Sequence, residues 1–176
     1  MNMEIILAGF GGQGILFAGK LLAYIGLFDN KEVSWLPSYG PEMRGGTANC
    51  SVCISDEPIG SPLVVEPDVL IAMNGPSRDK FINSVKPGGI AIIDSALVSG
   101  KSERDDISCF YIPATELAAQ HEMKGMANII LAGKLIKETG LGSAEEIKAA
   151  LNKIIPPKKS ALVEVNLNAL RLGMNF

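Results

Sequence analysis

The sequence is poor in the residues that most often bind nucleic acid or cross membranes. Its 176 residues include one histidine, three cysteines and 6% aromatic side chains, and the formal net charge is -3. Because the chain has no basic block and few aromatic residues, we expect no nucleic-acid partner. No apolar run reaches the roughly 20 residues of a membrane-spanning helix, so we expect no membrane insertion. The first apolar run starts almost at once, which leaves no room for a signal peptide and favours a cytoplasmic location.

The few cysteines do not predict a metal or redox site. Cys50 and Cys53 have C-x-x-C spacing, but residues 47–54 have the composition of a strand. Residues three apart on a strand point to opposite faces, so the two thiols should diverge. A second pair of zinc ligands is also missing. We therefore predict small buried cysteines and no metal site.

A glycine-rich turn near the start organises the rest of the chain. Residues 9–14 read Gly-Phe-Gly-Gly-Gln-Gly, after the apolar run 3–8 and before residues 15–28, whose apolar positions have helical spacing. Strand, glycine turn and helix form the context in which a G-x-G-x-x-G pattern indicates an anion or nucleotide site. The alternative is that these glycines only close a tight turn and bind nothing.

The second apolar segment does not support a dinucleotide site. Such a site usually has an acidic residue at the end of its second strand, where it holds the ribose. The second strand should cover residues 32–36, and it continues into Pro37 and Ser38 without an acid at its end. Glu32 lies at the start of that strand, which is too early.

The apolar segments predict the fold class. Buried strands at residues 69–73, 90–94 and 109–113 alternate with helical segments, which is typical of βαβ units and a largely parallel sheet. We predict one α/β domain over residues 1–176, Rossmann-like, with three layers, a mostly parallel sheet and helices on both faces. Residues 47–55 follow the second strand without a helix, so they can add an antiparallel strand.

Several short polar motifs mark helix starts. Ser77 is the expected cap of a helix that ends near residue 85, and Ser160 is the expected cap of the last helix. Ser143 precedes Glu146 by three residues, which matches a capping box. Asp94 ends a predicted strand at the ligand edge, where it either contacts a ligand or forms an Asx turn.

An irregular stretch follows the second strand. Residues 38–47 read Ser-Tyr-Gly-Pro-Glu-Met-Arg-Gly-Gly-Thr, and their glycines and proline exclude a regular element. The stretch begins at the carboxyl edge of the predicted sheet, where ligands of open α/β sheets bind. We interpret it as a contact loop with Arg44 as its charged anchor, directed at a partner carboxylate or at a phosphate. The alternative is a surface loop with a weak Arg44–Glu42 ion pair.

Two of these stretches together resemble a known family. Residues 9–14 are similar to the G-x-G-G-Q-G signature of the gamma subunit of 2-oxoacid:ferredoxin oxidoreductases. Residues 38–46 are similar to that family's second signature, S-Y-G-P-E-x-R-G-G, and the spacing of the two also fits. The resemblance covers essentially the whole chain and is greatest for the type that acts on 2-oxoglutarate or branched-chain 2-oxoacids.

The resemblance implies that this chain is one part of a larger enzyme. Such a complex decarboxylates a 2-oxoacid oxidatively, forms an acyl-CoA and reduces ferredoxin. Thiamine diphosphate and the iron-sulfur clusters belong to the alpha, beta and ferredoxin-like delta subunits. The gamma subunit contacts the thiamine-binding subunits and shapes the CoA side of the site. The sequence agrees, since it lacks the cysteine spacing of a ferredoxin cluster and a thiamine signature.

The expected site residues all come from the two signatures. They hold no cofactor by themselves, form no catalytic set and are expected to contact a ligand such as CoA. They are Gly9, Gly11, Gly12, Gln13, Gly14, Ser38, Tyr39, Glu42, Arg44, Gly45, Gly46 and Thr47. We therefore expect the isolated chain to be inactive. The alternative function is a free-standing Rossmann-like nucleotide-binding protein or enzyme.

Overall fold

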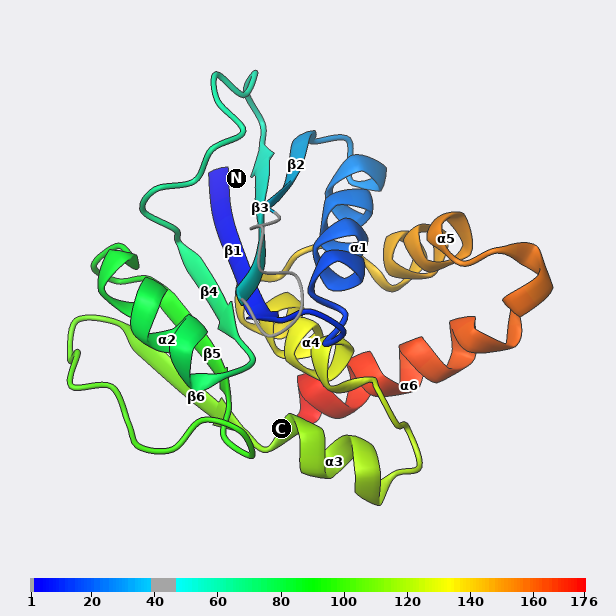
Figure 1. Ribbon diagram of the computed structural model, residues 1–176. Coiled ribbons are helices and arrows are strands. Elements are labelled where there is room, and N and C mark those ends of the chain that lie inside the picture. The colour runs from blue at the N-terminus through cyan, green and yellow to red at the C-terminus, as the bar shows by residue number, and fades with distance from the viewer. Residues whose placement is uncertain (1, 39–46) are drawn as a thin grey trace.

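The protein is built on one twisted six-stranded sheet (Figure 1). The computed structural model describes residues 2–38 and 47–176. The strands are β1 (Asn2–Phe10), β2 (Glu32–Ser38), β3 (Thr47–Ser55), β4 (Val69–Ala72), β5 (Ile90–Asp94) and β6 (Ser108–Ile112). Their order in the sheet is β2-β3-β1-β4-β5-β6.

The helices occupy both faces of the sheet, as the sequence predicts. They are α1 (Ile15–Phe28), α2 (Gly75–Phe81), α3 (Ala114–Gln120), α4 (Ala127–Thr139), α5 (Ala144–Ile154) and α6 (Ala161–Asn175). The described residues also contain two short 3-10 turns, η1 (Ile82–Ser84) and η2 (Pro157–Lys159). In Figure 1, α1, α4, α5 and α6 lie on one side of the sheet and α2 lies on the other. The predicted α/β fold is confirmed, with one face covered more thickly than the other.

The sheet is parallel except for one strand. β1, β4, β5 and β6 run parallel to one another, whereas β3 is antiparallel to both of its neighbours, β1 and β2. The antiparallel strand is thus confirmed, and it lies between β1 and β2. The second strand of the chain therefore does not neighbour the first, in contrast to the simplest nucleotide-binding arrangement.

Two hydrophobic cores pack on the two faces. Along β1, Ile5 and Leu7 enter the core beneath α1 and α4, while Ile6 and Ala8 enter the smaller core on the α2 side. Cys50 belongs to the first core and Cys53 to the second. The prediction that these thiols diverge is confirmed, because alternate residues of β3 face opposite layers.

Helix ends follow the sequence in part. The Ser143 and Glu146 capping box forms as predicted. The cap of α2 is Asn74, whose side chain accepts a hydrogen bond from the backbone N–H of Ser77 at 2.8 Å, so the expected role of Ser77 is wrong. Asn74 has the extended backbone of a cap residue, and Ser77 lies three positions inside the helix. Ser160 precedes α6 but makes no side-chain capping bond.

Glycines allow α4 and α6 to pack closely against each other. At Gly173 of α6, an added Cβ would lie 1.8 Å from the carbonyl oxygen of Ile130 in α4. At Gly133 of α4, it would lie 2.2 Å from the carbonyl oxygen of Leu170. The two helices thus touch backbone to backbone. Within residues 2–38 and 47–176, no helix is long and apolar enough to cross a membrane.

Candidate functional site

The carboxyl ends of β1 and β4 meet where the order of the sheet reverses. From β1 the chain continues to β2 and β3 on one side, and then returns to β4 on the other. In open α/β sheets the crevice at such a point is the usual ligand site. Thr47, the first residue of β3, pairs with Phe10, the last residue of β1. Ser38 at the end of β2 and Thr47 at the start of β3 therefore lie at the same edge as the glycine turn, as the sequence predicts.

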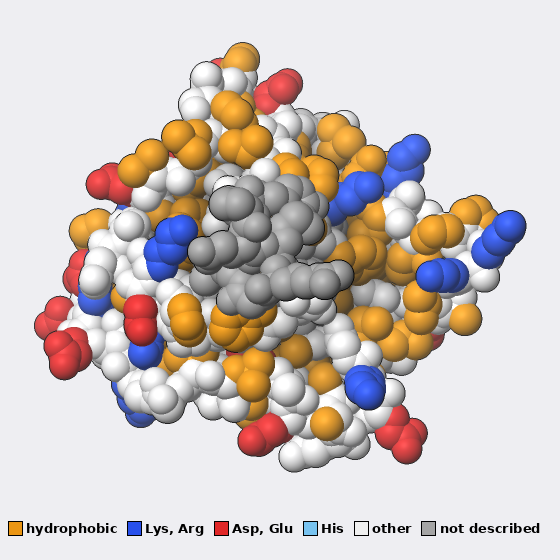
Figure 2. Space-filling view, viewed as in Figure 1, with side chains coloured by type: hydrophobic (Ala, Val, Ile, Leu, Met, Phe, Trp, Pro, Cys, Tyr) orange, Lys and Arg blue, Asp and Glu red, His pale blue; other side chains and the backbone are white. Residues whose placement is uncertain are grey.

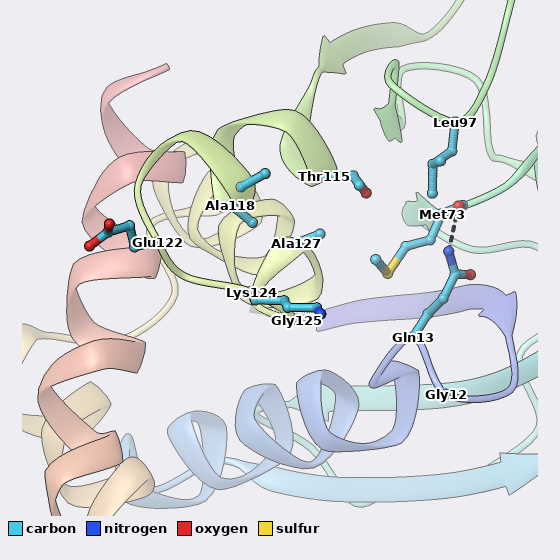
Figure 3. Close-up of a pocket in the computed structure, with 11 residues that line it drawn as sticks. Gly12, Gln13, Met73, Leu97, Thr115, Ala118, Glu122, Lys124, Gly125 and Ala127 are labelled. Atoms are coloured by element: carbon cyan, nitrogen blue, oxygen red, sulfur yellow. Dashed lines mark hydrogen bonds between the residues drawn. The ribbon is translucent and has the colours of Figure 1, made fainter.

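A pocket of about 590 Å³ opens at this edge. Figure 3 shows its walls, which come from the glycine turn, the residue after β4, the loop after β5, α3 and the connection from α3 to α4. The lining residues are Gly12, Gln13, Met73, Leu97, Thr115, Ala118, Ala119, Glu122, Lys124, Gly125 and Ala127. The walls are mainly apolar, so the pocket suits a ligand with a substantial apolar part and a few polar groups.

The glycine turn has structural requirements of its own. Gly12 and Gly14 have positive φ angles of 92° and 74°, a region that residues with a Cβ rarely adopt. The carbonyl of Gly14 accepts a hydrogen bond from Asn128 Nδ2 of α4 at 2.9 Å. A Cβ at Gly14 would lie 2.4 Å from that nitrogen. Close packing of α1 on α4 therefore requires glycine here, whether or not a ligand binds.

Asp94 takes no part in the pocket. Its side chain is fully buried, and it accepts a hydrogen bond from the Thr115 hydroxyl at 2.6 Å. It also accepts from the backbone N–H of Ala96 at 3.1 Å. Asp94 thus forms the turn after β5 and ties it to the start of α3. Of the two interpretations of Asp94, the Asx turn is confirmed, and its effect on the pocket is limited to fixing Thr115.

The charged groups of the pocket lie on the connection between α3 and α4. Lys124 and Glu122 are both exposed, and among the described residues Lys124 has no ion-pair partner. Figure 3 shows the Lys124 side chain on the connection that leads into α4. Glu122 has a positive φ of 57°, which is uncommon for a residue with a side chain. The sequence did not predict this connection as part of the site, and Gly125 is its one local signal.

The thiols of Cys50 and Cys53 are not in settings that favour a reactive thiolate. Burial raises the pKa of Cys50 to about 12, although its contact with the Trp35 side chain opposes this. Burial also raises the pKa of Cys53. A thiol with a raised pKa is a poor nucleophile at neutral pH. In the described part of the chain, no group of three or more His, Cys, Asp or Glu side chains could hold a metal ion.

The predicted site residues separate into four groups. Gly12 and Gln13 line the pocket. Gly14 lines a second groove of about 310 Å³ together with Asn128, and Gly125 lines both this groove and the pocket. Gly9, Gly11 and Ser38 are not among the lining residues, and they lie at or just beyond the ends of β1 and β2. The backbone of Thr47 begins β3 at the same edge. Tyr39, Glu42, Arg44, Gly45 and Gly46 fall outside the described residues.

Comparison with known proteins places the chain among oxidoreductase subunits. The family model described as pyruvate ferredoxin/flavodoxin oxidoreductase matches residues 4–176. The 2-oxoglutarate synthase subunit KorC of Methanocaldococcus jannaschii is 40% identical over 176 residues, which cover 98% of this chain and 92% of KorC. The ketoisovalerate oxidoreductase subunit VorA of Methanothermobacter marburgensis is 37% identical over 175 residues. That match covers 99% of this chain but 36% of VorA, so the chain spans about a third of that relative.

A solved structure agrees with the fold. It is the gamma subunit of a keto/oxoacid ferredoxin oxidoreductase from Geobacter sulfurreducens. The two chains are 31% identical, with a TM-score of 0.83, and the match covers 98% of this chain and 96% of the other. The similarity therefore includes the whole sheet and its helices.

Proposed function

Because the chain belongs to the pyruvate ferredoxin/flavodoxin oxidoreductase family, we propose that it is the gamma subunit of a multi-subunit 2-oxoacid:ferredoxin oxidoreductase. The complex would decarboxylate a 2-oxoacid oxidatively, form an acyl-CoA and reduce ferredoxin. The observation that carries this proposal is the match with KorC along nearly the full length of both chains. It also favours 2-oxoglutarate over pyruvate as the substrate, with a branched-chain 2-oxoacid as the second choice because of the similarity to VorA.

This chain would bind and position rather than catalyse. The polar Thr115 hydroxyl of the pocket is already bonded to Asp94, and the ionisable groups in the lining are the exposed Glu122 and Lys124. Neither of these is in the buried, paired setting that activates an acid or a base. The chemistry would be supplied by thiamine diphosphate and iron-sulfur clusters in alpha, beta and delta subunits. Reaction with ferredoxin would also occur through the complex.

We place the CoA side of the assembled active site at this pocket. Its apolar walls suit the uncharged arm of CoA, and Lys124 supplies a cation that suits a phosphate. Phe10 and Leu97, at the same edge, are 38% and 47% exposed, so they offer apolar surface that a partner could cover. Figure 2 shows apolar side chains exposed over the right half and the lower middle of this face, with the acidic side chains mostly near its periphery. A partner subunit would cover this edge and complete the site.

Two broader predictions accompany this proposal. Residues 1–176 would form one domain, which the single continuous sheet and the extent of the family match support. The complex would work in the cytoplasm, where ferredoxin-dependent metabolism takes place.

The competing function is a free-standing nucleotide-binding protein. In its favour is the glycine turn at the end of β1. Against it, β2 carries its acid, Glu32, at the start, and β3 separates β2 from β1. No acid on β2 is therefore in place to hold a ribose beside the turn.

Co-purification tests the proposal. We expect the native chain to purify with larger subunits that carry thiamine diphosphate and iron, and the purified complex to reduce ferredoxin with 2-oxoglutarate and CoA. Parallel assays with pyruvate and branched-chain 2-oxoacids identify the substrate. Purification as a colourless single chain that binds a nucleotide would support the competing function and reject ours.

A further inference from the structure

We propose that the Gln13 side chain is a clamp that positions the glycine turn against the end of β4, and that it is not a ligand contact. The inference rests on the proposed function only where it concerns CoA. Gln13 is a positioning residue in this proposal, because it acts on a ligand through the wall of the pocket.

The hydrogen bonds of Gln13 join two segments far apart in the sequence. Its Oε1 accepts from the backbone N–H of Phe10 at 2.6 Å, within the turn. Its Nε2 donates to the carbonyl of Met73 at 3.1 Å, just beyond β4. Figure 3 shows this second bond along the wall of the pocket. Both atoms of the amide are therefore directed at the protein backbone.

A third contact extends the clamp to the opposite face of the sheet. Asn74 Nδ2 donates to Gln13 Oε1 at 3.5 Å, and Asn74 Oδ1 caps α2. Oε1 has two lone pairs, and Phe10 and Asn74 occupy both. Only one N–H of Gln13 remains for any other partner. An amide committed in this way is poorly placed to recognise a ligand as well.

The clamp continues the sheet past its last backbone pair. The parallel pairing of β1 with β4 ends at Ala8 and Ala72, followed by one bond from Met73 N–H to the carbonyl of Ala8 at 2.9 Å. Beyond that point the segment after β1 continues to α1 and the segment after β4 continues to α2, so the two segments separate. Gln13 bridges this opening. It thereby fixes the distance between Gly12 and Met73, two parts of the same pocket wall.

The first glycine of the turn makes room for the clamp. A Cβ at Gly9 would lie 2.6 Å from Gln13 Oε1 and 2.9 Å from Ile15 Cδ1. Gly9 does not line the pocket. Its lack of a side chain is therefore explained by the approach of Gln13, without any ligand. Gly9→Ala becomes a way to displace the clamp without touching the ligand surface.

Hydrogen exchange of the full-length chain tests the geometry. We expect Gln13→Leu to speed exchange of the Phe10 amide by roughly tenfold or more, because the variant removes its acceptor. Gln13→Glu keeps an acceptor oxygen and should leave that amide protected. Equal exchange in the parent and in Gln13→Leu would show that the clamp does not form. This measurement needs no partner subunit, so it tests the hydrogen bonds of Gln13 even if the proposed function is wrong.

CoA kinetics of the assembled complex test the consequence. We expect Gln13→Leu and Gly9→Ala each to raise the KM for CoA by roughly fivefold, the scale of one lost hydrogen bond. The kcat should stay within about twofold, since a displaced wall weakens binding and leaves the partner's chemistry intact. The double variant should be no worse than the more affected single one, because both disable the same clamp. A raised KM in Gln13→Leu with a normal KM in Gly9→Ala would mean that Gln13 contacts CoA directly, and would overturn the proposal.

Discussion

At the scale of single residues, Lys124 is the cation of the pocket. It lies on the connection from α3 to α4, without an ion-pair partner among the described residues. We predict that Lys124→Ala raises the KM for CoA by about two- to fivefold, the range expected for one exposed charge pair. The effect should shrink as salt is added, because exposed charges are screened. Lys137→Ala, at the far end of α4, is the matched control. If both variants behave like the parent at limiting CoA, the phosphate contact lies elsewhere.

Arg44 remains a prediction from the sequence alone. It belongs to the 38–47 stretch, whose ends lie on the ligand edge of the sheet. Truncation of an arginine buried in an interface can cost about 2 kcal/mol or more. We therefore expect Arg44→Ala to leave the lone chain folded but to weaken assembly, if the target is a partner carboxylate, or to raise the KM for CoA, if it is a phosphate. Arg44→Lys should restore only part of the loss, since lysine lacks the planar fork. Normal assembly and normal CoA kinetics would reduce this stretch to a solvated connection.

At the scale of elements, the contact of α4 with α6 depends on glycine. We predict that Gly173→Ala lowers the free energy of unfolding by about 1–3 kcal/mol, the usual cost of overpacking. The added methyl group would meet the backbone of Ile130, which cannot rotate away as a side chain can. Alanine is otherwise the better helix former by about 1 kcal/mol, so destabilisation would mean that packing outweighs propensity. The measurement is urea unfolding of the lone chain.

A matched control exists in α2. At Gly75 an added Cβ meets no atom within 4 Å. Gly75→Ala should therefore be neutral or slightly stabilising, because only helix propensity changes. If Gly173→Ala had the same free energy of unfolding as Gly75→Ala, α4 and α6 would be able to move apart without loss of stability.

At the scale of the whole molecule, the chain should be inactive by itself. The described pocket offers no activated nucleophile, acid or base, and the family chemistry depends on cofactors that we assign to partner subunits. We predict no turnover when the purified chain is assayed with 2-oxoglutarate, CoA, thiamine diphosphate and an artificial electron acceptor. Adding the partner subunits should restore activity. Turnover by the lone chain would require a site that the proposal does not contain.

The sequence by itself determined the local structure. The range 15–28 of α1, the range 47–55 of β3 and the capping box at Ser143 all match the structure. These features depend on apolar period, β-branched and apolar runs, and side chains that bond to nearby backbone. Each is decided by residues within a few positions of one another. The two signatures also carried the family, because irregular motifs with fixed spacing are specific.

Only the tertiary structure decided what those elements do together. It placed β3 between β1 and β2. It directed the Asp94 side chain to the backbone of the turn after β5, and it formed part of the pocket wall from the connection that carries Lys124. Gln13 reaches Met73 across 60 positions, and Asn128 reaches Gly14 across 114. Contacts at such separations depend on how the whole sheet and its helices pack, and no local pattern encodes them. For this reason the glycine turn was predicted as a ligand contact, although the roles visible in the structure for Gly9, Gln13 and Gly14 are packing and hydrogen bonding.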